Sequence, residues 1–559
     1  MRSGIKLLLI AAYVASQFGV YSERLLGLDS AVKLVIYLGL CGLVVLGVLC
    51  AAQIGIGLVR YAFALGFLAG STVFLSFQQI TAEFLTYNSY ISISKAAGFI
   101  GEALAEHYRP ILQAVGLSLL LALGIAIRPS RLPGFSAWVT YPVPVLVLAL
   151  LSGLLFIRGG DGAKGLPPAY TVLAYASLSL YEHSTQVIGE RRPVSMAREN
   201  RPIDFDIILV VDESISPLYL DITGPGDVDT GLRDAPPPTR VHNYGYAAAI
   251  SHCSLESNLT IRYGGTRTDY LAYIHTMPSI WEYARMAGMK TTYIDAQRTG
   301  GTLQNQMTAE ELALIDNFVQ FDDTPLLERD LLAADEIVRL ARNDEPDFVL
   351  VNKLGAHFPV HDKFPDSHIR YRPILPRGRF TNIADTGSRE GFSGKAKDWR
   401  AYRNSYRNTL LWSVGEFFKR LFAAELDNYV MIYTADHGQD LHENHSEGLN
   451  THCSSYPHFI EGMVPMVVIE DAALQTLDWG RYRRANRNRT SHYQMFPTLL
   501  ELMAYDSAEI ARVYGQSLHL ESTDPMTFNT NFHARLGEKA EWMKIDFGRM
   551  VTPPPGDSQ

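Results

Sequence analysis

The chain has 559 residues, a formal net charge of −9 and a hydrophobic content of 47%. This length allows several domains, and the negative charge gives no sign of a nucleic-acid-binding protein. The arginine cluster Arg481–Arg489 is expected to be a solvated loop face, so no nucleic-acid partner is expected.

Residues 1–160 differ from the rest of the chain and predict a membrane domain. Apolar runs occur at about 5–21, 32–52, 55–77, 111–128 and 137–157, each near the roughly 20 residues that cross a bilayer. The first run resembles a signal peptide, but no clear small-residue cleavage site lies before the next run. We therefore expect about five membrane-spanning helices, the first of them an uncleaved anchor.

Positive charges predict the orientation of these helices. Arg2 and Lys6 favour a cytoplasmic start, and Arg60 lies near the next cytoplasmic turn. Arg128 and Arg131 mark the short link between the fourth and fifth spans. An odd number of spans then places the rest of the chain outside the cytoplasm.

The connection 78–110 between the third and fourth spans faces outward on this topology. Polar residues such as Gln78, Thr81 and Thr86 alternate there with apolar ones. The connection is either an amphipathic element at the membrane interface, where it could touch a lipid headgroup, or a solvated hinge.

Residues 161–202 predict a linker, because glycines and prolines are followed by a short helical pattern and a charged run. In residues 203–552, strand patterns alternate with helical ones, which predicts an α/β domain with a mainly parallel, doubly wound sheet. Residues 553–559 are expected to be a disordered tail. The expected strands are Phe205–Val211, Thr291–Ile294, Phe348–Asn352, Tyr429–Thr434 and Pro465–Ile469, and the clearest helices are Leu326–Arg342 and Tyr402–Leu421.

Asp436 and His437 lie just past the predicted strand Tyr429–Thr434. Ligands of open α/β sheets bind at the carboxyl ends of the strands, and this pair offers one oxygen and one nitrogen to a divalent cation. The Asp-His-Gly motif is weak alone, since a turn or cap role would also explain it. Glu213, at the end of the strand Phe205–Val211, would add a second carboxylate to the same crevice.

The segment 251–260 is rich in hydroxyl groups and leads into helix-compatible sequence. Free backbone N–H groups at a helix N-terminus are capped by a hydroxyl and also suit a phosphate. Ser254 and Ser257 are therefore either helix caps or candidates for a nucleophile, which a metal ion would activate.

Two histidines lie in loops of the same domain. His357 follows the predicted strand Phe348–Asn352, and His452 lies in the loop after the Asp-His pair. A lone loop histidine is most often a surface residue. Next to a set of carboxylate and imidazole donors, the two are better explained as phosphate or metal contacts.

As an ordered set, these residues resemble one family. They are similar to the alkaline-phosphatase-superfamily domain of phosphoethanolamine transferases, which include the lipid A-modifying and colistin-resistance enzymes. The resemblance covers nearly the whole chain, including the five-span membrane domain and a late segment at 491–500. The motifs that carry it are Glu213, Cys253-Ser-Leu-Glu-Ser257, Gly355-x-His357-x-Pro359, Asp436-His-Gly438 and His452.

The resemblance implies a zinc site, because a Glu, the nucleophilic Thr, an Asp and a His hold zinc in this family. The corresponding residues are Glu213, Ser257, Asp436 and His437. Mn²⁺ is the alternative to Zn²⁺, because oxygen-rich sites also suit it. Ser257 would be the nucleophile, with Ser254 as its rival, and His357 and His452 would contact the transferred phosphate group.

The resemblance further implies a reaction and a location. Phosphoethanolamine would move from phosphatidylethanolamine to lipid A, a core sugar or another envelope glycan, through a phospho-serine intermediate. The protein would be a multi-pass protein of the bacterial inner membrane with its catalytic domain in the periplasm. A glycerol-phosphate transferase and a non-catalytic lipid-sensing regulator are the alternatives. Sulfatase chemistry is disfavoured, because no Cys/Ser-x-Pro-x-Arg signature surrounds Ser257.

Cysteine usage is thin. Cys41 and Cys50 lie in an apolar span, which leaves Cys253 and Cys453 in the exported part. Cys253 lies four residues before Ser257 and Cys453 follows His452, so the two sulfurs could pair if both segments line one crevice. Whether they pair is left open.

Overall fold

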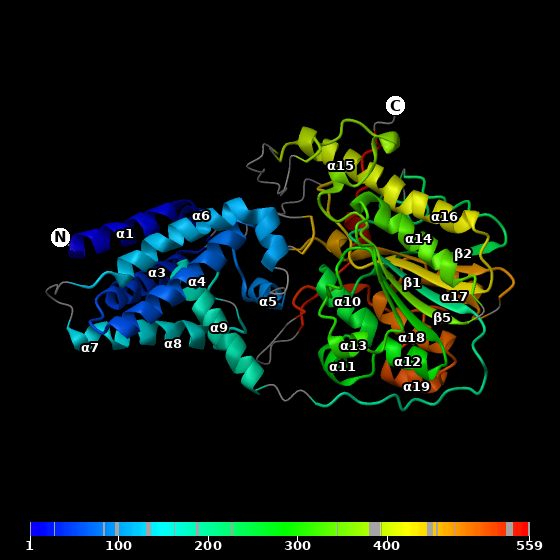
Figure 1. Cartoon of the computed structure of the whole chain (residues 1–559), viewed down its shortest axis with the longest axis horizontal. Helices are drawn as coiled ribbons and strands as arrows, with labels where there is room; N and C mark the ends of the chain where they lie inside the picture. The colour runs from blue at the N-terminus through cyan, green and yellow to red at the C-terminus, as the bar shows by residue number, and fades with distance from the viewer. Residues whose placement is uncertain are drawn as a thin grey trace. The chain divides into compact units, whose positions relative to one another are not determined.

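The computed structural model describes the chain apart from residues 1, 27, 29, 82–83, 96–99, 130–135, 161, 186–188, 225, 227, 344, 379–391, 393, 444–450, 454–456, 475, 533–539 and 557–559. Two compact units form (Figure 1). The first comprises Met1–Val187 with His533–Ala540, and the second comprises Ile188–Phe532 with Glu541–Gln559.

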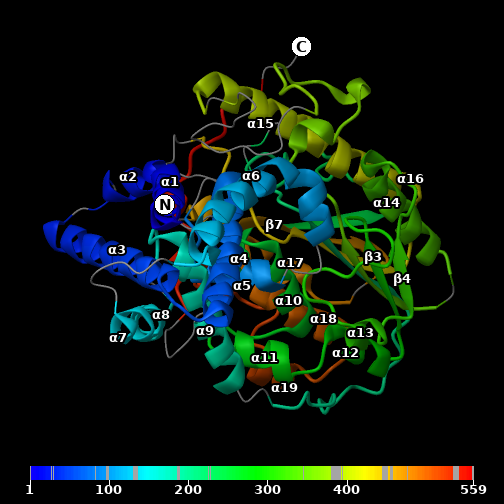
Figure 2. The ribbon, with the colours of Figure 1, turned by 60° about the vertical axis from the view of Figure 1, so that its left-hand side comes forward.

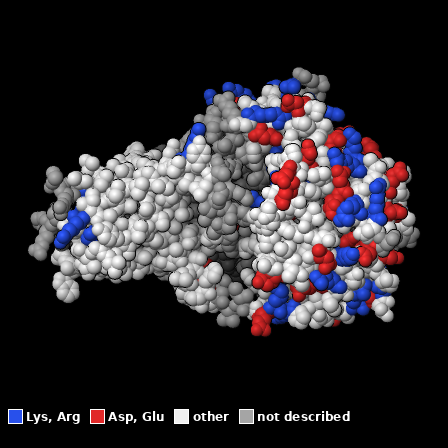
Figure 3. Space-filling model, viewed as in Figure 1, with Lys and Arg blue, Asp and Glu red and all other residues white. Residues whose placement is uncertain are grey.

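The first unit is helical. Its helices are α1 (Arg2–Ser16), α2 (Phe18–Leu26), α3 (Ala31–Ala52), α4 (Gly57–Thr81), α5 (Tyr87–Lys95), α6 (Ile100–Ala126), α7 (Ala137–Thr140), α8 (Pro142–Ile157) and α9 (Pro168–Thr185). Four segments of the described part are long and apolar enough to cross a membrane: Ala31–Ala52, Gly57–Thr81, His107–Ala126 and Ala137–Ile157. The visible surface of this unit carries few charges, whereas charged side chains are spread over the second unit (Figure 3).

The first of the five expected spans differs from the prediction. Its apolar run is divided between α1 and α2, and the 15 residues of α1 span only about 22 Å at ~1.5 Å per residue, less than the roughly 30 Å of a hydrocarbon core. The structure thus supports four of the five spans by length, and the fifth stays a prediction. Arg131, used for the expected topology, lies outside the described residues.

Two cationic side chains hold one end of the helical unit together. Lys6 donates to the carbonyl oxygen of Ile125 at 3.1 Å, and Arg60 donates to that of Ala126 at 3.2 Å. Both side chains are buried. They satisfy carbonyl groups at the C-terminus of α6 that have no partner within the helix.

The segment 161–202 is not simply a linker. Its residues 168–185 form α9, which packs against α4 and α8 and buries Tyr170 and Tyr175. The apolar part of the expected linker therefore belongs to the first unit, and the second unit begins at Ile188.

The second unit contains an eight-stranded sheet in the order β4-β3-β5-β1-β6-β7-β2-β8. The central strands β3, β5, β1 and β6 are parallel, whereas β7 runs antiparallel to both β6 and β2. This confirms the predicted α/β class. The strands are β1 (Asp206–Asp212), β2 (Thr239–Ala248), β3 (Lys290–Asp295), β4 (Asn317–Gln320), β5 (Asp347–Asn352), β6 (Tyr429–Ala435), β7 (Met463–Asp471) and β8 (Thr490–Ser491), with a separate hairpin of β9 (Thr527–Asn529) and β10 (Trp542–Lys544).

Helices cover both faces of this sheet. α14 and α16 lie on one face, and α10, α12 and α18 on the other (Figures 1 and 2). All residues of β1, β5 and β6 are buried, as expected for strands covered on both sides. The helices are α10 (Ser254–Tyr263), α11 (Tyr270–Thr276), α12 (Ile280–Met286), α13 (Ala309–Leu312), α14 (Arg329–Leu340), α15 (Ala396–Leu410), α16 (Phe417–Ala423), α17 (Trp479–Asn486), α18 (Met495–Leu502) and α19 (Ser507–Val513).

The expected tail is ordered in its described part. Pro553 is buried, and Arg407 donates a hydrogen bond to the carbonyl oxygen of Pro554. Residues 553–556 therefore lie against the second unit instead of forming a disordered tail, and residues 557–559 lie outside the described part.

Candidate active site

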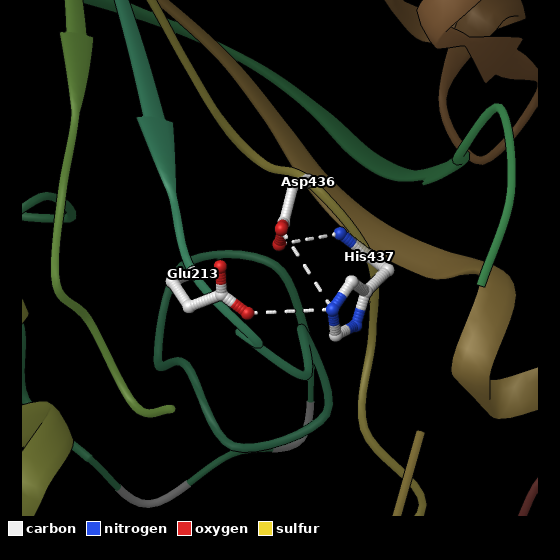
Figure 4. A group of neighbouring side chains, drawn as sticks. All are labelled: Glu213, Asp436 and His437. Atoms are coloured by element: carbon white, nitrogen blue, oxygen red, sulfur yellow. Dashed lines mark hydrogen bonds and ion pairs between the residues drawn. The ribbon is translucent and has the colours of Figure 1, made fainter. Parts of the chain in front are cut away.

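The site forms where two neighbouring parallel strands end. Asp212 and Ala435 are paired in register at the ends of β1 and β6. Glu213 and Asp436 follow these residues directly and therefore lie side by side, with His437 next to them (Figure 4). The register of one strand pair thus brings together residues more than 200 positions apart.

Glu213, Asp436 and His437 fit a metal ion. One donor atom from each lies within 4.8 Å of the others, and all three side chains are at most 2% exposed. Nδ1 of His437 hydrogen-bonds the carbonyl oxygen of Gly438 at 2.8 Å, so the ring presents an Nε2 lone pair to the other two residues once it has lost its second proton. Within the described residues, Oδ2 of Asp436 is buried without a hydrogen-bond partner. A bound cation would satisfy this oxygen.

The structure brings Ser254, and not Ser257, to these three residues. The Ser254 hydroxyl lies 3.3 Å from each carboxylate oxygen of Glu213 and 3.2 Å from Nε2 of His437. The Ser257 hydroxyl is fully buried and instead bonds the backbone carbonyl and N–H of Ser251. The expected role of Ser257 as metal ligand and nucleophile is therefore not supported by the geometry, which favours Ser254.

Ser254 is the first residue of α10, and Cys253 is the helix N-cap. A hydroxyl at this position lies among backbone N–H groups that have no partner in the helix, a favourable place for negative charge. Cys253 forms a disulfide with Cys453, next to His452. The disulfide thus ties the Ser254 turn to the histidine loop and answers the question that the sequence left open.

His357 and His452 lie beside the metal-binding candidates. The ring of His452 stacks on that of His437 with centroids 4.6 Å apart, and His357 lies 6.0 Å from His452. Burial and the neighbouring imidazoles lower the pKa of His452 well below its usual value, so this ring is neutral and can donate one N–H. His357 is exposed. The two rings are placed to contact an oxygen of a substrate that approaches Ser254.

Two motif glycines are required by close backbone approach. A Cβ atom at Gly438 would lie 2.2 Å from the carbonyl oxygen of Met463, and one at Gly355 would lie 2.4 Å from a carboxylate oxygen of Asp212. Gly355 also has a φ of +50°, which L side chains rarely adopt. Gly355 lets the loop after β5 pass against the backbone of Glu213, and Gly438 lets the loop after β6 pass against the start of β7.

Sequence reasoning missed Gln297 and Ser214. Gln297 follows β3 and donates to Glu213 at 3.1 Å, and the Ser214 hydroxyl donates to the other Glu213 oxygen at 2.8 Å. The backbone N–H of Ser214 also donates to Asp436 at 3.1 Å. Both residues orient the carboxylates. Gln297 could have been identified from the sequence, because ligands of such sheets bind at the carboxyl ends of the strands and the strand before Gln297 was predicted.

A buried ion pair supports the end of β1. Lys353 donates to Asp212 at 2.6 Å, and the Tyr433 hydroxyl contacts the same oxygen at 3.1 Å. The side chains of Lys353 and Asp212 are completely buried, so the loss of either partner would leave an uncompensated charge. This pair fixes the backbone from which Glu213 projects.

Without a cation, Asp436 and His437 each hold a proton. Burial, reinforced by the charge of Glu213, raises the pKa of Asp436 to about 8. Burial disfavours a charged imidazole, but Asp436 and Glu213 outweigh it and raise the pKa of His437 to about 10. Both groups are therefore protonated at pH 6 to 7 and must lose these protons to bind a metal.

Metal binding is accordingly expected to tighten as the pH rises. Below both pKa values each bound ion displaces up to two protons, so the dissociation constant should fall by about 10- to 100-fold per pH unit between pH 6 and 8. The dependence should weaken once Asp436 has lost its proton. Competition with a chelator at pH 6, 7 and 8 measures this, and a dissociation constant that does not change with pH would contradict the site.

Thiol labelling is expected to modify two of the four cysteines, Cys41 and Cys50, in the denatured, unreduced protein. All four should react after reduction. Because the disulfide joins residues 200 positions apart, opening it should lower the free energy of unfolding by about 5 kcal/mol in the chain-entropy model. Labelling of four cysteines without reductant would show that the pair is open.

The doubly wound sheet, with a metal-donor set and a hydroxyl at its strand ends, defines an alkaline-phosphatase-like α/β domain. The family model described as Sulfatase matches residues 206–505, more than half of the chain, and the chain belongs to this family. No curated protein matches the sequence.

One solved structure extends the similarity to the helical unit. The integral membrane protein lipooligosaccharide phosphoethanolamine transferase A (EptA) from Neisseria meningitidis matches with a TM-score of 0.63 and 16% identity, over 92% of this chain and 98% of that chain. The C-terminal periplasmic domain of EcEptC from Escherichia coli matches with a TM-score of 0.49 and 16% identity, over 66% and 100% of the two chains. At this identity the likeness to EptA shows the fold.

Proposed function

We propose that the protein transfers phosphoethanolamine from phosphatidylethanolamine to a glycan or lipid acceptor of the bacterial cell envelope, through a covalent intermediate on Ser254. The observation that carries this proposal is the Ser254 hydroxyl, 3.2 Å from His437 and 3.3 Å from Glu213 at the N-terminus of α10. Membership in the sulfatase family and the fold shared with a full-length membrane transferase support it.

Four side chains would hold the metal ion: Glu213, Ser254, Asp436 and His437. One nitrogen and several oxygen donors fit Zn²⁺, with Mn²⁺ as the alternative. When bound, the cation would neutralise charge on the phosphate and lower the pKa of the serine hydroxyl.

Side chains of the protein would carry out the transfer itself. The Ser254 oxygen forms a bond to phosphorus while the bond from phosphorus to the diacylglycerol oxygen breaks, and the serine proton ends on diacylglycerol. His452 and His357 hold the phosphoryl oxygens in line. An acceptor hydroxyl then attacks phosphorus, the bond to Ser254 breaks, and the serine regains a proton from the acceptor.

The proposed location is the inner membrane, with the second unit in the periplasm. The apolar helices of the first unit support the membrane part. The disulfide Cys253–Cys453 supports the periplasm, because such bonds persist in oxidising compartments. Lipid A, a core sugar and another envelope glycan remain the candidate acceptors.

Two alternatives share this architecture. A glycerol-phosphate transferase would use phosphatidylglycerol with the same nucleophile and metal site. A non-catalytic lipid-sensing regulator would not need the donor set, whereas here every position holds a competent donor, which favours an enzyme.

The test is to incubate the purified full-length protein and Zn²⁺ or Mn²⁺ with phosphatidylethanolamine or phosphatidylglycerol. Release of diacylglycerol from phosphatidylethanolamine, with a phosphoethanolamine adduct in the protein, is expected. Cleavage of phosphatidylglycerol alone would favour the glycerol-phosphate reaction. Cleavage of neither lipid with either metal would favour the regulator.

A further inference from the structure

A second pocket lies in the catalytic unit outside the metal site. It is open, has a volume of about 680 Å³, and contains none of the residues assigned above to the reaction. Its walls come from β2, from the segment after α17, from residues 522–526 and from the C-terminal segment that includes β10. The volume falls in the range of roughly 300–1,000 Å³ typical of small-molecule sites.

The pocket is cationic. Arg487, Arg489 and Lys544 line it with exposed side chains. Among the described residues, no carboxylate forms an ion pair with any of these three. The single lining carboxylate, Asp524, is already neutralised by two 2.8 Å hydrogen bonds from Arg267. The net charge suits an anion, and guanidinium groups match the geometry of phosphate oxygens.

One wall of the pocket is aromatic. Tyr246 and Phe547 stack with centroids 6.2 Å apart and planes 19° from parallel. Tyr246 is buried and supports the exposed Phe547 ring, which is the apolar surface beside the cations. A free phosphate or a small phospholipid headgroup would use only the cationic side. A phosphorylated sugar would use both sides, since its ring can lie on the flat wall while its phosphate meets the arginines.

The pocket lies within reach of the nucleophile. Tyr246 on β2 precedes Ser254 by eight residues, so their Cα atoms are at most about 28 Å apart. The segment that forms another wall also reaches the catalytic turn, because the N–H of Asn529 donates to the carbonyl oxygen of Ile250 at 2.8 Å. An extended acceptor could therefore occupy the pocket with one part and approach Ser254 with another.

We propose that this pocket binds the phosphate-bearing sugar headgroup of the acceptor. This inference rests on the proposed transfer to an envelope acceptor and narrows the acceptor to a phosphorylated glycan or glycolipid. Arg487 and Arg489 hold the phosphate, Lys544 adds charge, and Tyr246 with Phe547 supports the sugar ring.

The binding test uses the metal-loaded, full-length protein and four probes: glucosamine 6-phosphate, glucosamine, inorganic phosphate and glycerol 3-phosphate. Glucosamine 6-phosphate should bind most tightly, and the double substitution Arg487→Ala with Arg489→Ala should weaken this binding by about tenfold or more. The matched control is Arg483→Ala with Arg484→Ala, which removes two arginines of the same cluster from α17 outside the pocket. This control should bind as the unmodified protein does.

A catalytic readout separates this inference from the proposed function. The Arg487 and Arg489 variant should cleave phosphatidylethanolamine at the normal rate but show a KM for a phosphorylated glycolipid acceptor raised about tenfold or more. If this variant transfers at the normal rate, or if it binds glucosamine 6-phosphate as tightly as the unmodified protein, the pocket is not the acceptor site. Equal binding of inorganic phosphate or glycerol 3-phosphate overturns the sugar assignment. If the unmodified protein binds glucosamine 6-phosphate but does not cleave phosphatidylethanolamine, only the proposed transfer reaction is overturned.

Discussion

Replacement of Ser254 by alanine is expected to lower the rate of phosphoethanolamine transfer by on the order of 10⁴-fold or more, because removal of a nucleophile leaves only binding and charge stabilisation. The hydroxyl is the only group of this side chain that reaches Glu213 and His437. The covalent adduct on the enzyme should disappear as well. Mass spectrometry of the peptide that contains residues 251–262, after incubation with phosphatidylethanolamine, measures this.

Ser257→Ala is the matched control, one helical turn further along α10. It removes a buried hydroxyl that bonds only the backbone of Ser251, so it should lower stability by about 1 kcal/mol and leave transfer measurable. An adduct on Ser257, or full turnover by the Ser254 variant, would restore the assignment that the sequence favoured and contradict the one made from the structure.

Substitution of Asp436 by asparagine is expected to remove bound metal and activity together. The side chain keeps its size but loses the charge that a divalent cation needs, and Glu213, Ser254 and His437 remain as the three other donors. Loss of a metal ligand should weaken metal affinity by roughly 100-fold or more, since even partners of ligands cost about 10- to 100-fold. Metal content after gel filtration and the rate of diacylglycerol release measure both effects.

Asp471→Asn provides the comparison for this substitution. Asp471 is also a buried carboxylate on the sheet, but it ends β7 at the edge where β2 begins, and it accepts hydrogen bonds from Asn428 and Ala473. It should change stability and leave the metal content at its normal value. A full complement of metal in the Asp436 variant would mean that the ion is held elsewhere.

Much of the fold could be predicted because its central strands are short apolar runs with little ambiguity. All five expected strands are present, and β1, β5 and β6 are entirely buried. The strand β2 was missed because its sequence, Thr239–Ala248, mixes arginine, histidine, asparagine and glycine. Its ladder with β7 shifts register between Asn243 and Gly245, where the N–H of Gly245 donates to the Asn243 side chain, and the next residue, Tyr246, donates to the Asn488 side chain.

Part of the candidate site could be predicted because its residues directly follow strands that are easy to recognise. The residues directly after β1 and β6 follow from strand order, and the structure brings Glu213, Asp436 and His437 together. The choice between Ser254 and Ser257 could not be made from spacing, because it depends on which side of the first turn of α10 faces the strand ends. Only the three-dimensional course of the turn places Ser254 there.

The disulfide Cys253–Cys453 also constrains the order of assembly. Its ends are 200 positions apart, and the loop between them includes β3, β4, β5 and β6, half of the strands of the sheet. The native bond needs both cysteines, so it can form only after residue 453 has been synthesised and its segment lies beside the earlier one. Closure of this loop therefore requires that the chain through Cys453 is present, and a chain interrupted before residue 453 would lack the bond that ties the Ser254 turn to the histidine loop. The bond thus joins the nucleophile turn, early in the domain, to a loop that the chain reaches only after four further strands.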